Sequence, residues 1–296
     1  MSPKSKLKVA AVIFDLDGTL VDTADEFVGV VQALRAEHGR EAMDAARIRA
    51  SVSNGARALV SLGLDMTEDA PGFERNRLRL LELYSEVLGT AASPYPGILE
   101  LLDTLAERGI CWGVATNKPR AYTLPLLDRL AFDPAPASVV CPDDVKDRKP
   151  HPESLYLNCR HLDCSPADAV YIGDHRRDIE AGRRAGMFTV AAAYGYIEPD
   201  DDPDDWGASV RVDDSRDLID LLLANVCKLN VTRFPYEIAR LAQDIAGGLL
   251  VTGALVGLPP FFKYVSYPYD PAQLLLFTFA LFMLAVFVRL LLPKRD

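Results

Sequence analysis

Two carboxylates, Asp15 and Asp17, follow a short apolar run at residues 9–14 and precede the turn Gly18-Thr19. Because ligands of a parallel sheet gather outside the carboxyl ends of its strands, we expect Asp15 to project into a crevice while Gly18 lets the backbone turn away. A carboxylate held in such a crevice can attack phosphorus. The pair therefore predicts nucleophilic catalysis on a phosphate ester.

Two other interpretations of this segment compete with catalysis. A calcium loop of the EF-hand type needs a third acidic position before the glycine and a closing glutamate between flanking helices, and this segment has none of them. An ordinary surface turn after a strand stays open on these residues alone.

A hydroxyl, a lysine and a further acid follow at wider spacing. Residues 110–115 predict a second strand that ends before Thr116, and residues 169–174 predict a third strand that ends in Asp174. Lys149 lies between them, ahead of a proline-stiffened turn. Alone, Thr116 is typical of a helix cap and Lys149 of a solvated side chain. In this order after the acid pair, they indicate one phosphoryl-transfer site.

Together the four motifs resemble the haloacid dehalogenase superfamily, and within it the small-molecule phosphatases of the phosphoglycolate phosphatase type. The resemblance covers roughly the first 227 residues. It implies an α/β fold with a doubly wound parallel sheet. The catalytic core would be formed by residues 1–20 and 94–227, and a helical cap would be inserted at residues 21–93.

The resemblance also implies a role for each motif residue. Asp15 would be the nucleophile and Asp17 the general acid and base, Thr116 would hold the transferring phosphoryl group, and Lys149 would offset its charge. The cofactor would be Mg²⁺, bound by Asp15, Asp174 and the carbonyl of Asp17. A metal and a lysine are needed because a phosphomonoester dianion repels a carboxylate nucleophile.

Two residues after the third strand are less settled. Asp178, on the opening turn of a predicted helix, is expected to support the site by orienting Lys149 or a metal-bound water. His175 stands where relatives carry a second acid or a small hydroxyl residue, which leaves the outer shell of the metal open.

The cap is expected to read the leaving group. Two of its helices are predicted at 25–37 and 73–88, where apolar residues recur at helical spacing and are expected to form the cap core. These residues are Phe27, Val28, Val31 and Leu34 in the first segment and Leu78, Leu81 and Tyr84 in the second. Between them, residues 51–57 combine small, amide and cationic groups that could close over the site, or could form a plain solvent-facing loop. The expected substrate-binding residues are Asn54, Gly55, Arg57, Thr116, Asn117 and Lys149.

Local resemblance at residues 51–60, 141–146 and 194–208 is to the N-acetylmuramic acid 6-phosphate phosphatases of bacterial cell-wall recycling. Such a substrate carries a carboxylate as well as its phosphate, and Arg57 is our candidate partner because a guanidinium can bind a carboxylate in two places. Phosphoglycolate also has a carboxylate, so Arg57 alone does not separate the two substrates. A sugar-phosphate mutase and a membrane-bound phosphate sensor without catalysis also remain as alternatives.

Composition narrows the function classes. A formal net charge of -10 and the lack of a basic stripe argue against nucleic-acid binding. Five cysteines without a disulfide pattern favour reduced thiols in a cytosolic compartment. Cys159 and Cys164 superficially suggest a zinc site, but no second pair lies nearby.

The C-terminal segment, residues 228–296, departs from the family pattern. Residues 241–262 and 272–292 are long and apolar enough for two spans of a bilayer, and basic flanks place both ends on the cytoplasmic side. Gly253 and Gly257 would let these helices, or two copies of the chain, pack closely as a homodimer. We therefore expect a multi-pass anchor in the bacterial inner membrane with a cytoplasmic catalytic domain, and a cytoplasmic protein as the alternative.

Overall fold

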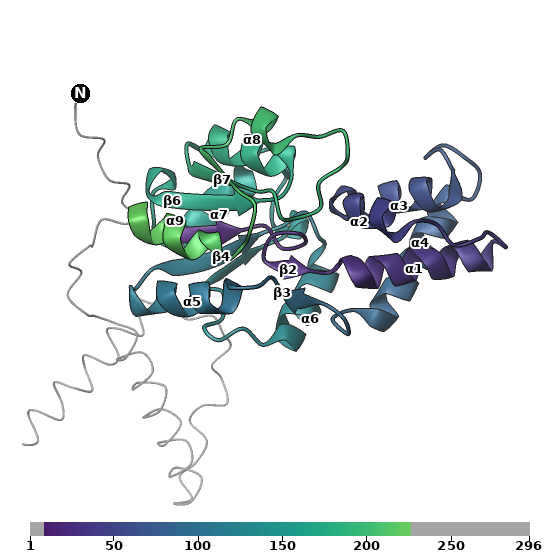
Figure 1. Ribbon diagram of the computed structural model, residues 1–296, viewed down its shortest axis with the longest axis horizontal. Helices are drawn as coiled ribbons and strands as arrows, with labels where there is room; N and C mark the ends of the chain where they lie inside the picture. Colours follow the sequence, from purple (N-terminus) through teal and green to yellow (C-terminus); the bar gives the residue numbers. More distant parts are fainter. Residues whose placement is uncertain (1–8, 226–296) are drawn as a thin grey trace, which may run out of the picture. The chain divides into compact units, whose positions relative to one another are not determined.

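The computed structural model describes residues 9–225 (Figure 1). Six parallel strands form one sheet in the order β5-β4-β1-β6-β7-β8. Their bounds are Ala11–Phe14 for β1, Cys111–Ala115 for β4, Ser138–Val140 for β5, Ala169–Gly173 for β6, Phe188–Ala192 for β7 and Val210–Val212 for β8. The predicted α/β class with a parallel sheet is confirmed. The strand order reverses at β1, which is where such sheets hold their ligands.

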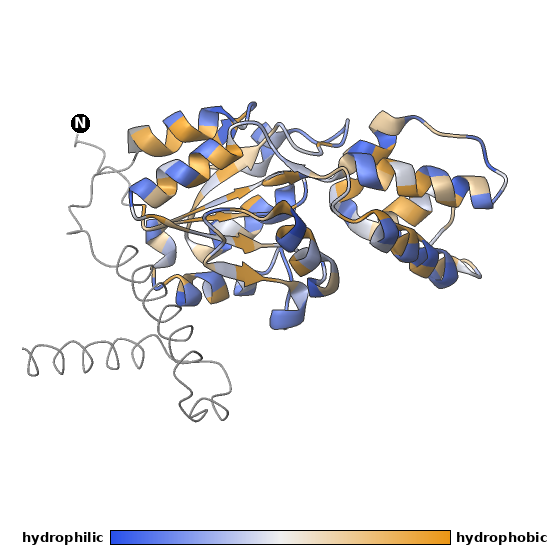
Figure 2. Cartoon of the chain, turned by 90° about the horizontal axis from the view of Figure 1, so that it is seen from below, coloured by the Kyte–Doolittle hydropathy of each residue, from blue (hydrophilic) through white to orange (hydrophobic). Residues whose placement is uncertain are grey.

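Both faces of β1 are buried, as its uninterrupted apolar sequence requires. Ala11 and Ile13 pack with helices α7 (Glu153–His161) and α8 (Arg176–Ala185). Val12 and Phe14 belong to the larger core with α5 (Ile98–Glu107) and α9 (Asp217–Asn225). Helix α6 (Arg120–Leu130) follows β4. Figure 2 shows the resulting apolar strands between helices whose outer faces are polar.

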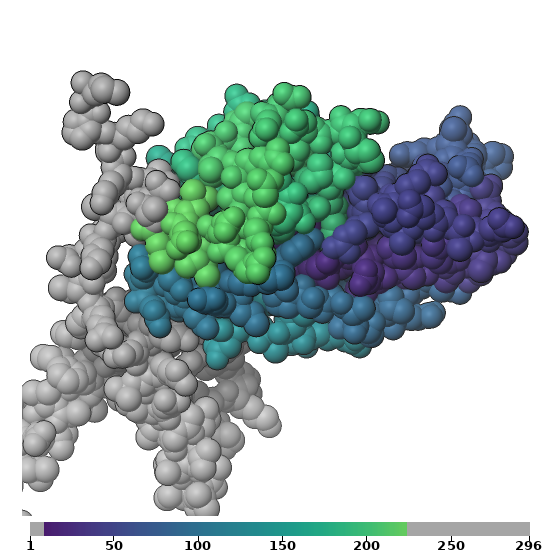
Figure 3. All heavy atoms as spheres, viewed as in Figure 1, coloured from purple at the N-terminus to yellow at the C-terminus, as the bar shows by residue number. Residues whose placement is uncertain are grey.

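A helical unit interrupts the core between β2 (Val21–Asp22) and β3 (Ser93–Pro94). These two short strands pair with each other in antiparallel register, so both connections to the unit run side by side. The unit, called the cap below, contains α1 (Ala24–Glu37), α2 (Ala45–Ala50), the 3₁₀ turn η1 (Val52–Asn54), α3 (Gly55–Leu64) and α4 (Phe73–Val87). Figure 3 shows it as a block of purple and blue atoms beside the core.

The two helices expected from apolar spacing correspond to α1 and α4. In α1 the side chains of Phe27, Val31 and Leu34 are buried as expected. In α4 the expectation is confirmed at Tyr84, which is buried, and is wrong at Leu78, which is 53% exposed; Phe73 and Leu80 fill the cap core together with Tyr84. A short 3₁₀ helix, η4 (Pro203–Trp206), lies between β7 and β8. Two further 3₁₀ helices are η2 (Pro142–Asp144), which follows β5, and η3 (Pro166–Asp168), which precedes β6.

Within residues 9–225, none of the helices is both long and apolar enough to cross a membrane. The two spans predicted at 241–262 and 272–292, and the Gly253–Gly257 contact, lie outside the described residues. The four cysteines in the described part are free thiols, and Cys227 lies beyond it.

Helix α5 offers a matched pair of leucines for testing the core. Leu102 is fully buried and Leu99 is 53% exposed. We expect Leu102→Ala to lower the free energy of unfolding by about 2–5 kcal/mol, because it leaves a cavity. Leu99→Ala should lower it by less than about 1 kcal/mol. Urea titration followed by circular dichroism measures both, and equal losses would contradict the packing described.

Candidate active site

Asp15 follows β1 directly and sits at the carboxyl edge of the sheet. Its backbone N–H donates to the carbonyl of Ile172 in β6, which extends the strand pairing by one residue. Its Oδ1 accepts the N–H of Leu16 at 2.7 Å. The carboxylate is therefore held by its own turn, with its side chain 12% exposed.

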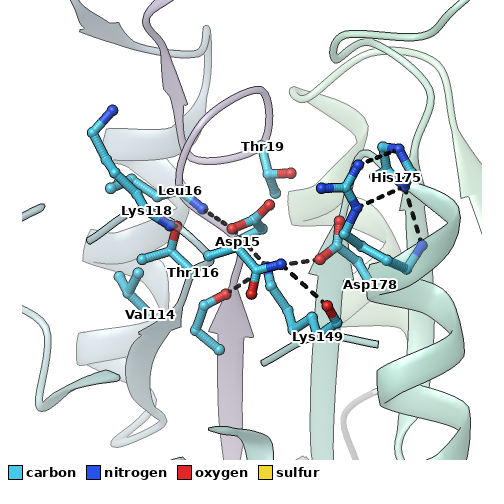
Figure 4. Close-up of polar contacts among 12 residues, drawn as sticks. Asp15, Leu16, Thr19, Val114, Thr116, Lys118, Lys149, His175 and Asp178 are labelled. Carbon is cyan, nitrogen blue, oxygen red and sulfur yellow. Dashed lines mark hydrogen bonds and ion pairs between the residues drawn. The ribbon is translucent and has the colours of Figure 1, made fainter. Parts of the chain in front are cut away.

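Lys149 lies beneath this carboxylate and joins it to a second one. Its Nζ is 2.8 Å from Oδ1 of Asp15 and 2.7 Å from Oδ1 of Asp178, and the lysine side chain is 1% exposed. It also donates to the carbonyl of Ala115 and to the hydroxyl of Tyr171. In Figure 4 Lys149 lies between Asp15 and Asp178. The structure thus assigns Asp178 a direct contact with Lys149.

Burial and pairing act against each other in this group. Burial raises the pKa of Asp15 to about 6, although the ammonium of Lys149 opposes the shift. For Lys149, burial lowers the pKa, but the two carboxylates outweigh it and leave the pKa raised. The lysine is therefore charged, and ionising Asp15 costs free energy in spite of it.

Asp174 follows β6 and is 1% exposed. Its Oδ2 accepts the N–H of Tyr196 and the hydroxyl of Ser53, each at 2.9 Å. Gly18, at φ +82°, and Gly195 pack so closely on it that a Cβ on either would overlap the Asp174 side chain. Burial, then the charges of Asp15 and Asp178, raise the pKa of Asp174 well above its usual range.

These three acids form a group that fits a divalent cation. Carboxylate oxygens of Asp15, Asp174 and Asp178 lie within 4.8 Å of one another. Oδ2 of Asp178 is buried and has no hydrogen-bond partner among residues 9–225. Buried acids at this spacing raise one another's pKa unless a cation compensates, and hard oxygen donors are the ligands that Mg²⁺ prefers. The observed group includes Asp178, which we expected only in support.

Asp17 points to a different set of partners. Its Oδ1 accepts the hydroxyl of Thr23 at 2.7 Å and the ammonium of Lys118 at 2.9 Å. Neither partner was singled out from the sequence. Lys118 comes directly after Thr116-Asn117, so it is adjacent to a recognised motif. Nothing in the sequence spacing indicates that its side chain contacts Asp17.

Thr116 and Asn117 lie on the turn that follows β4. Thr116 is 3% exposed, and its Oγ1 accepts the N–H of Lys118. Asn117 donates from Nδ2 to the carbonyl of Lys149 at 3.2 Å, which links two of the predicted motifs. Figure 4 shows Thr116 and Lys118 on one side of Asp15, and Asp178 and His175 on the other.

The cap turn at η1 contacts the site through residues that include Asn54. Arg177 of α8 donates to the carbonyl of Ser53 and to Oδ1 of Asn54, at 2.9 and 2.7 Å. Nδ2 of Asn54 donates to Glu198. His175 also faces Asn54, at 3.2 Å, and its ring lies outside the acid group. Burial and the nearby Arg177 lower the pKa of His175 to about 4, so the ring is neutral.

The remaining predicted substrate residues are placed differently. Gly55 begins α3 directly after this turn. Arg57, two residues further, contacts Glu68 and Glu74 within the cap, and its side chain is 48% exposed. The structure does not bring Arg57 to the acid group, because these two cap carboxylates bind its guanidinium.

A second group of possible ligands, Asp147, His151 and Glu153, lies at the surface. Neither group found in residues 9–225 contains a cysteine, so the sequence hint of zinc at Cys159 and Cys164 has no counterpart there.

Comparison with known proteins relates the chain to one family of hydrolases. A family model described as haloacid dehalogenase-like hydrolase matches residues 12–192. The chain is 45% identical over 222 residues to an N-acetylmuramic acid 6-phosphate phosphatase of Pseudomonas aeruginosa, covering 75% of this chain and 98% of the relative. It is 37% identical over 203 residues to a phosphoglycolate phosphatase of Xanthomonas campestris, covering 69% and 91%. Among solved structures, a predicted phosphoglycolate phosphatase from Haemophilus somnus superposes with a TM-score of 0.64 at 25% identity, covering 72% of this chain and 97% of that one.

The raised pKa of Asp15 has a consequence for stability. The pKa of Asp15 is about 6 in the folded state and 3.8 when unperturbed. The ionised carboxylate therefore lowers the free energy of unfolding fully above pH about 6, and this loss disappears below pH about 4, where Asp15 is protonated in both states. In metal-free protein, Asp15→Asn should therefore raise the free energy of unfolding at pH 8 by on the order of 2 kcal/mol, and the gain should shrink toward pH 4.5.

Chemical denaturation in EDTA at the two pH values measures this difference. Asp103→Asn, on the exposed face of α5, is the matched control and should shift stability by less than about 0.5 kcal/mol at either pH. A gain for Asp15→Asn that is the same at both pH values would contradict the assigned burial effect.

Proposed function

Because the chain belongs to the haloacid dehalogenase-like hydrolase family, we propose that it is a magnesium-dependent phosphomonoester hydrolase in which Asp15 is transiently phosphorylated. The observation that carries the proposal is the buried Lys149, within 2.8 Å of Asp15 and 2.7 Å of Asp178. It supplies a fixed positive charge beside the carboxylate that must approach a phosphate dianion.

In the first step an oxygen of Asp15 forms a bond to phosphorus as the bond from phosphorus to the leaving oxygen breaks. The electron pair of that bond stays on the leaving oxygen, which takes a proton from Asp17. Thr116 holds the transferring group, and Lys149 offsets its charge. Asp15, Asp174 and the carbonyl of Asp17 would hold magnesium, with Asp178 as a further candidate ligand. The bound ion would neutralise negative charge on the phosphate oxygens.

In the second step Asp17 takes a proton from water, whose oxygen attacks phosphorus and frees Asp15. Release of inorganic phosphate completes the cycle. Asp17 is therefore used twice, as acid and then as base, which requires that it stay in one position through both steps.

The proposed substrate is N-acetylmuramic acid 6-phosphate, which would place the enzyme in peptidoglycan recycling. The proposal is supported by 45% identity to a relative named for that activity. Phosphoglycolate is the second candidate, supported by 37% identity to a relative named for it. We propose that the cap turn with Ser53, Asn54 and Gly55 recognises the leaving group of the substrate. Arg57 instead forms ion pairs with two carboxylates of the cap.

The proposed membrane anchor rests on sequence alone. Residues 241–262 and 272–292 have the length and apolar character of two spans, and their basic flanks favour a cytoplasmic catalytic unit.

The function is tested by phosphate release from the purified full-length chain. With magnesium, N-acetylmuramic acid 6-phosphate should be hydrolysed with a kcat/KM at least about 10-fold above that for phosphoglycolate. EDTA should abolish turnover, and Asp15→Asn should lower kcat by at least about 1,000-fold, since the nucleophile is lost. Asp103→Asn serves as the unaffected control.

Faster hydrolysis of phosphoglycolate would contradict the substrate and spare the mechanism. Transfer of the phosphoryl group to a second sugar hydroxyl, with no free phosphate, would indicate a mutase. Full activity of Asp15→Asn would refute the mechanism itself.

The anchor is tested by washing membranes with alkaline carbonate. Full-length protein should stay in the pellet, because spanning helices resist such extraction, and a chain ending at residue 227 should appear in the supernatant. Release of the full-length chain would rule out the spans.

A further inference from the structure

Both hydrogen-bond donors that reach Asp17 bind the same carboxylate oxygen. The Thr23 hydroxyl and the Lys118 ammonium contact Oδ1, at 2.7 and 2.9 Å. Oδ2 accepts no hydrogen bond from the part of the chain that the structure describes, and the side chain is 16% exposed. With Oδ1 occupied by two donors, a proton carried by Asp17 must reside on Oδ2.

Lys118 is itself fixed by the cap. Its ammonium donates to the hydroxyl of Tyr84 at 2.6 Å and lies 4.6 Å from the centre of that ring. It is 5.1 Å from the ring of Phe27, which stacks on Tyr84 at 4.2 Å. Phe27 belongs to α1 and Tyr84 to α4, so aromatic rings from two cap helices contact a lysine of the core.

This enclosure leaves the lysine little freedom. Lys118 is 8% exposed, and a buried ammonium is tolerated only where partners replace its water. Asp17 and Tyr84 accept two of its three N–H bonds, and aromatic faces attract the remaining positive charge. Its backbone N–H also donates to Oγ1 of Thr116, the residue proposed to hold the phosphoryl group.

We propose that Lys118 is a positioning residue that holds Asp17 so that Oδ2 delivers the proton to the leaving oxygen, and that Tyr84 of the cap fixes Lys118 in that place. The inference rests on the proposed function, in which Asp17 is the general acid. As the bond from phosphorus breaks, the proton moves from Oδ2 to the leaving oxygen, and Lys118 stabilises the carboxylate that remains.

Positioning of a general acid has a kinetic signature that a purely structural role lacks. A leaving group that is a poor acid, such as phenol, needs a proton as it departs, whereas 4-nitrophenol departs readily without one. Loss of Lys118 should therefore harm reactions with poor leaving groups selectively. The slope of log kcat/KM against leaving-group pKa reports this, because kcat/KM covers the steps up to the transfer to Asp15.

The experiment compares substituted aryl phosphates from phenyl to 4-nitrophenyl phosphate with the full-length enzyme and magnesium. For Lys118→Met, kcat/KM should fall by about 100-fold or more on phenyl phosphate and by less than about threefold on 4-nitrophenyl phosphate. Tyr84→Phe should steepen the slope in the same direction by a smaller amount. The exposed Lys146→Met, and Tyr122→Phe on the ring beside Tyr84, are the matched controls and should keep the wild-type slope.

A double variant shows whether Lys118 acts through Asp17. In the Asp17→Asn background, Lys118→Met should cost less than about threefold on phenyl phosphate, since residues that act together are not additive. Three outcomes would overturn the inference: equal losses across the series, additive losses in the double variant, or a wild-type slope for both Lys118→Met and Tyr84→Phe. Turnover by the wild-type enzyme would still support the proposed function in each case. A wild-type enzyme that releases phosphate from neither the aryl series nor a sugar phosphate would overturn both.

Discussion

The buried ammonium of Lys149 is the interaction on which the site depends. Three acids, Asp15, Asp174 and Asp178, meet at the carboxyl edge of β1 and β6, and burial raises the pKa of the first two. Without a cation among them, the cheapest state would be a protonated and chemically inert cluster. Lys149 contributes one charge permanently, because both Asp15 and Asp178 bind it. The remaining negative charge is what makes the group suited to a divalent ion.

Sheet topology makes this concentration of charge feasible. Asp15 and Asp174 are far apart in the chain but directly follow neighbouring parallel strands, so their positions are fixed by backbone hydrogen bonds rather than by flexible side chains. Gly18 and Gly195 let two turns approach Asp174 more closely than any other residue would. The free energy needed to hold like charges together thus comes from the packing of a buried sheet.

The sequence predicted what is local and missed what the cap contributes. The strands before Asp15, Thr116 and Asp174 could be recognised because each apolar run ends in a polar residue within a few positions. The contacts of Lys118 and Ser53 could not, because their partners Asp17 and Asp174 are distant in the chain. Arg57 was predicted from its charge alone, and a sequence without coordinates does not show that Glu68 and Glu74 neutralise it. Likewise, helical spacing cannot distinguish the exposed Leu78 from its buried neighbour Leu80.

The cap also contacts the acids of the core. It reaches Asp174 through the hydroxyl of Ser53, and it reaches Asp17 through Tyr84 and Lys118. Both routes end at a carboxylate of the core: Ser53 donates to Asp174 directly, and Tyr84 accepts from the core lysine that donates to Asp17. A lid that only excluded water would strengthen the repulsion among these acids, since a lower dielectric increases every charge interaction. Because Ser53 donates to Asp174 and Tyr84 holds Lys118 against Asp17, the cap offsets that cost, so the electrostatics of the core carboxylates depend on the cap as well as on the sheet.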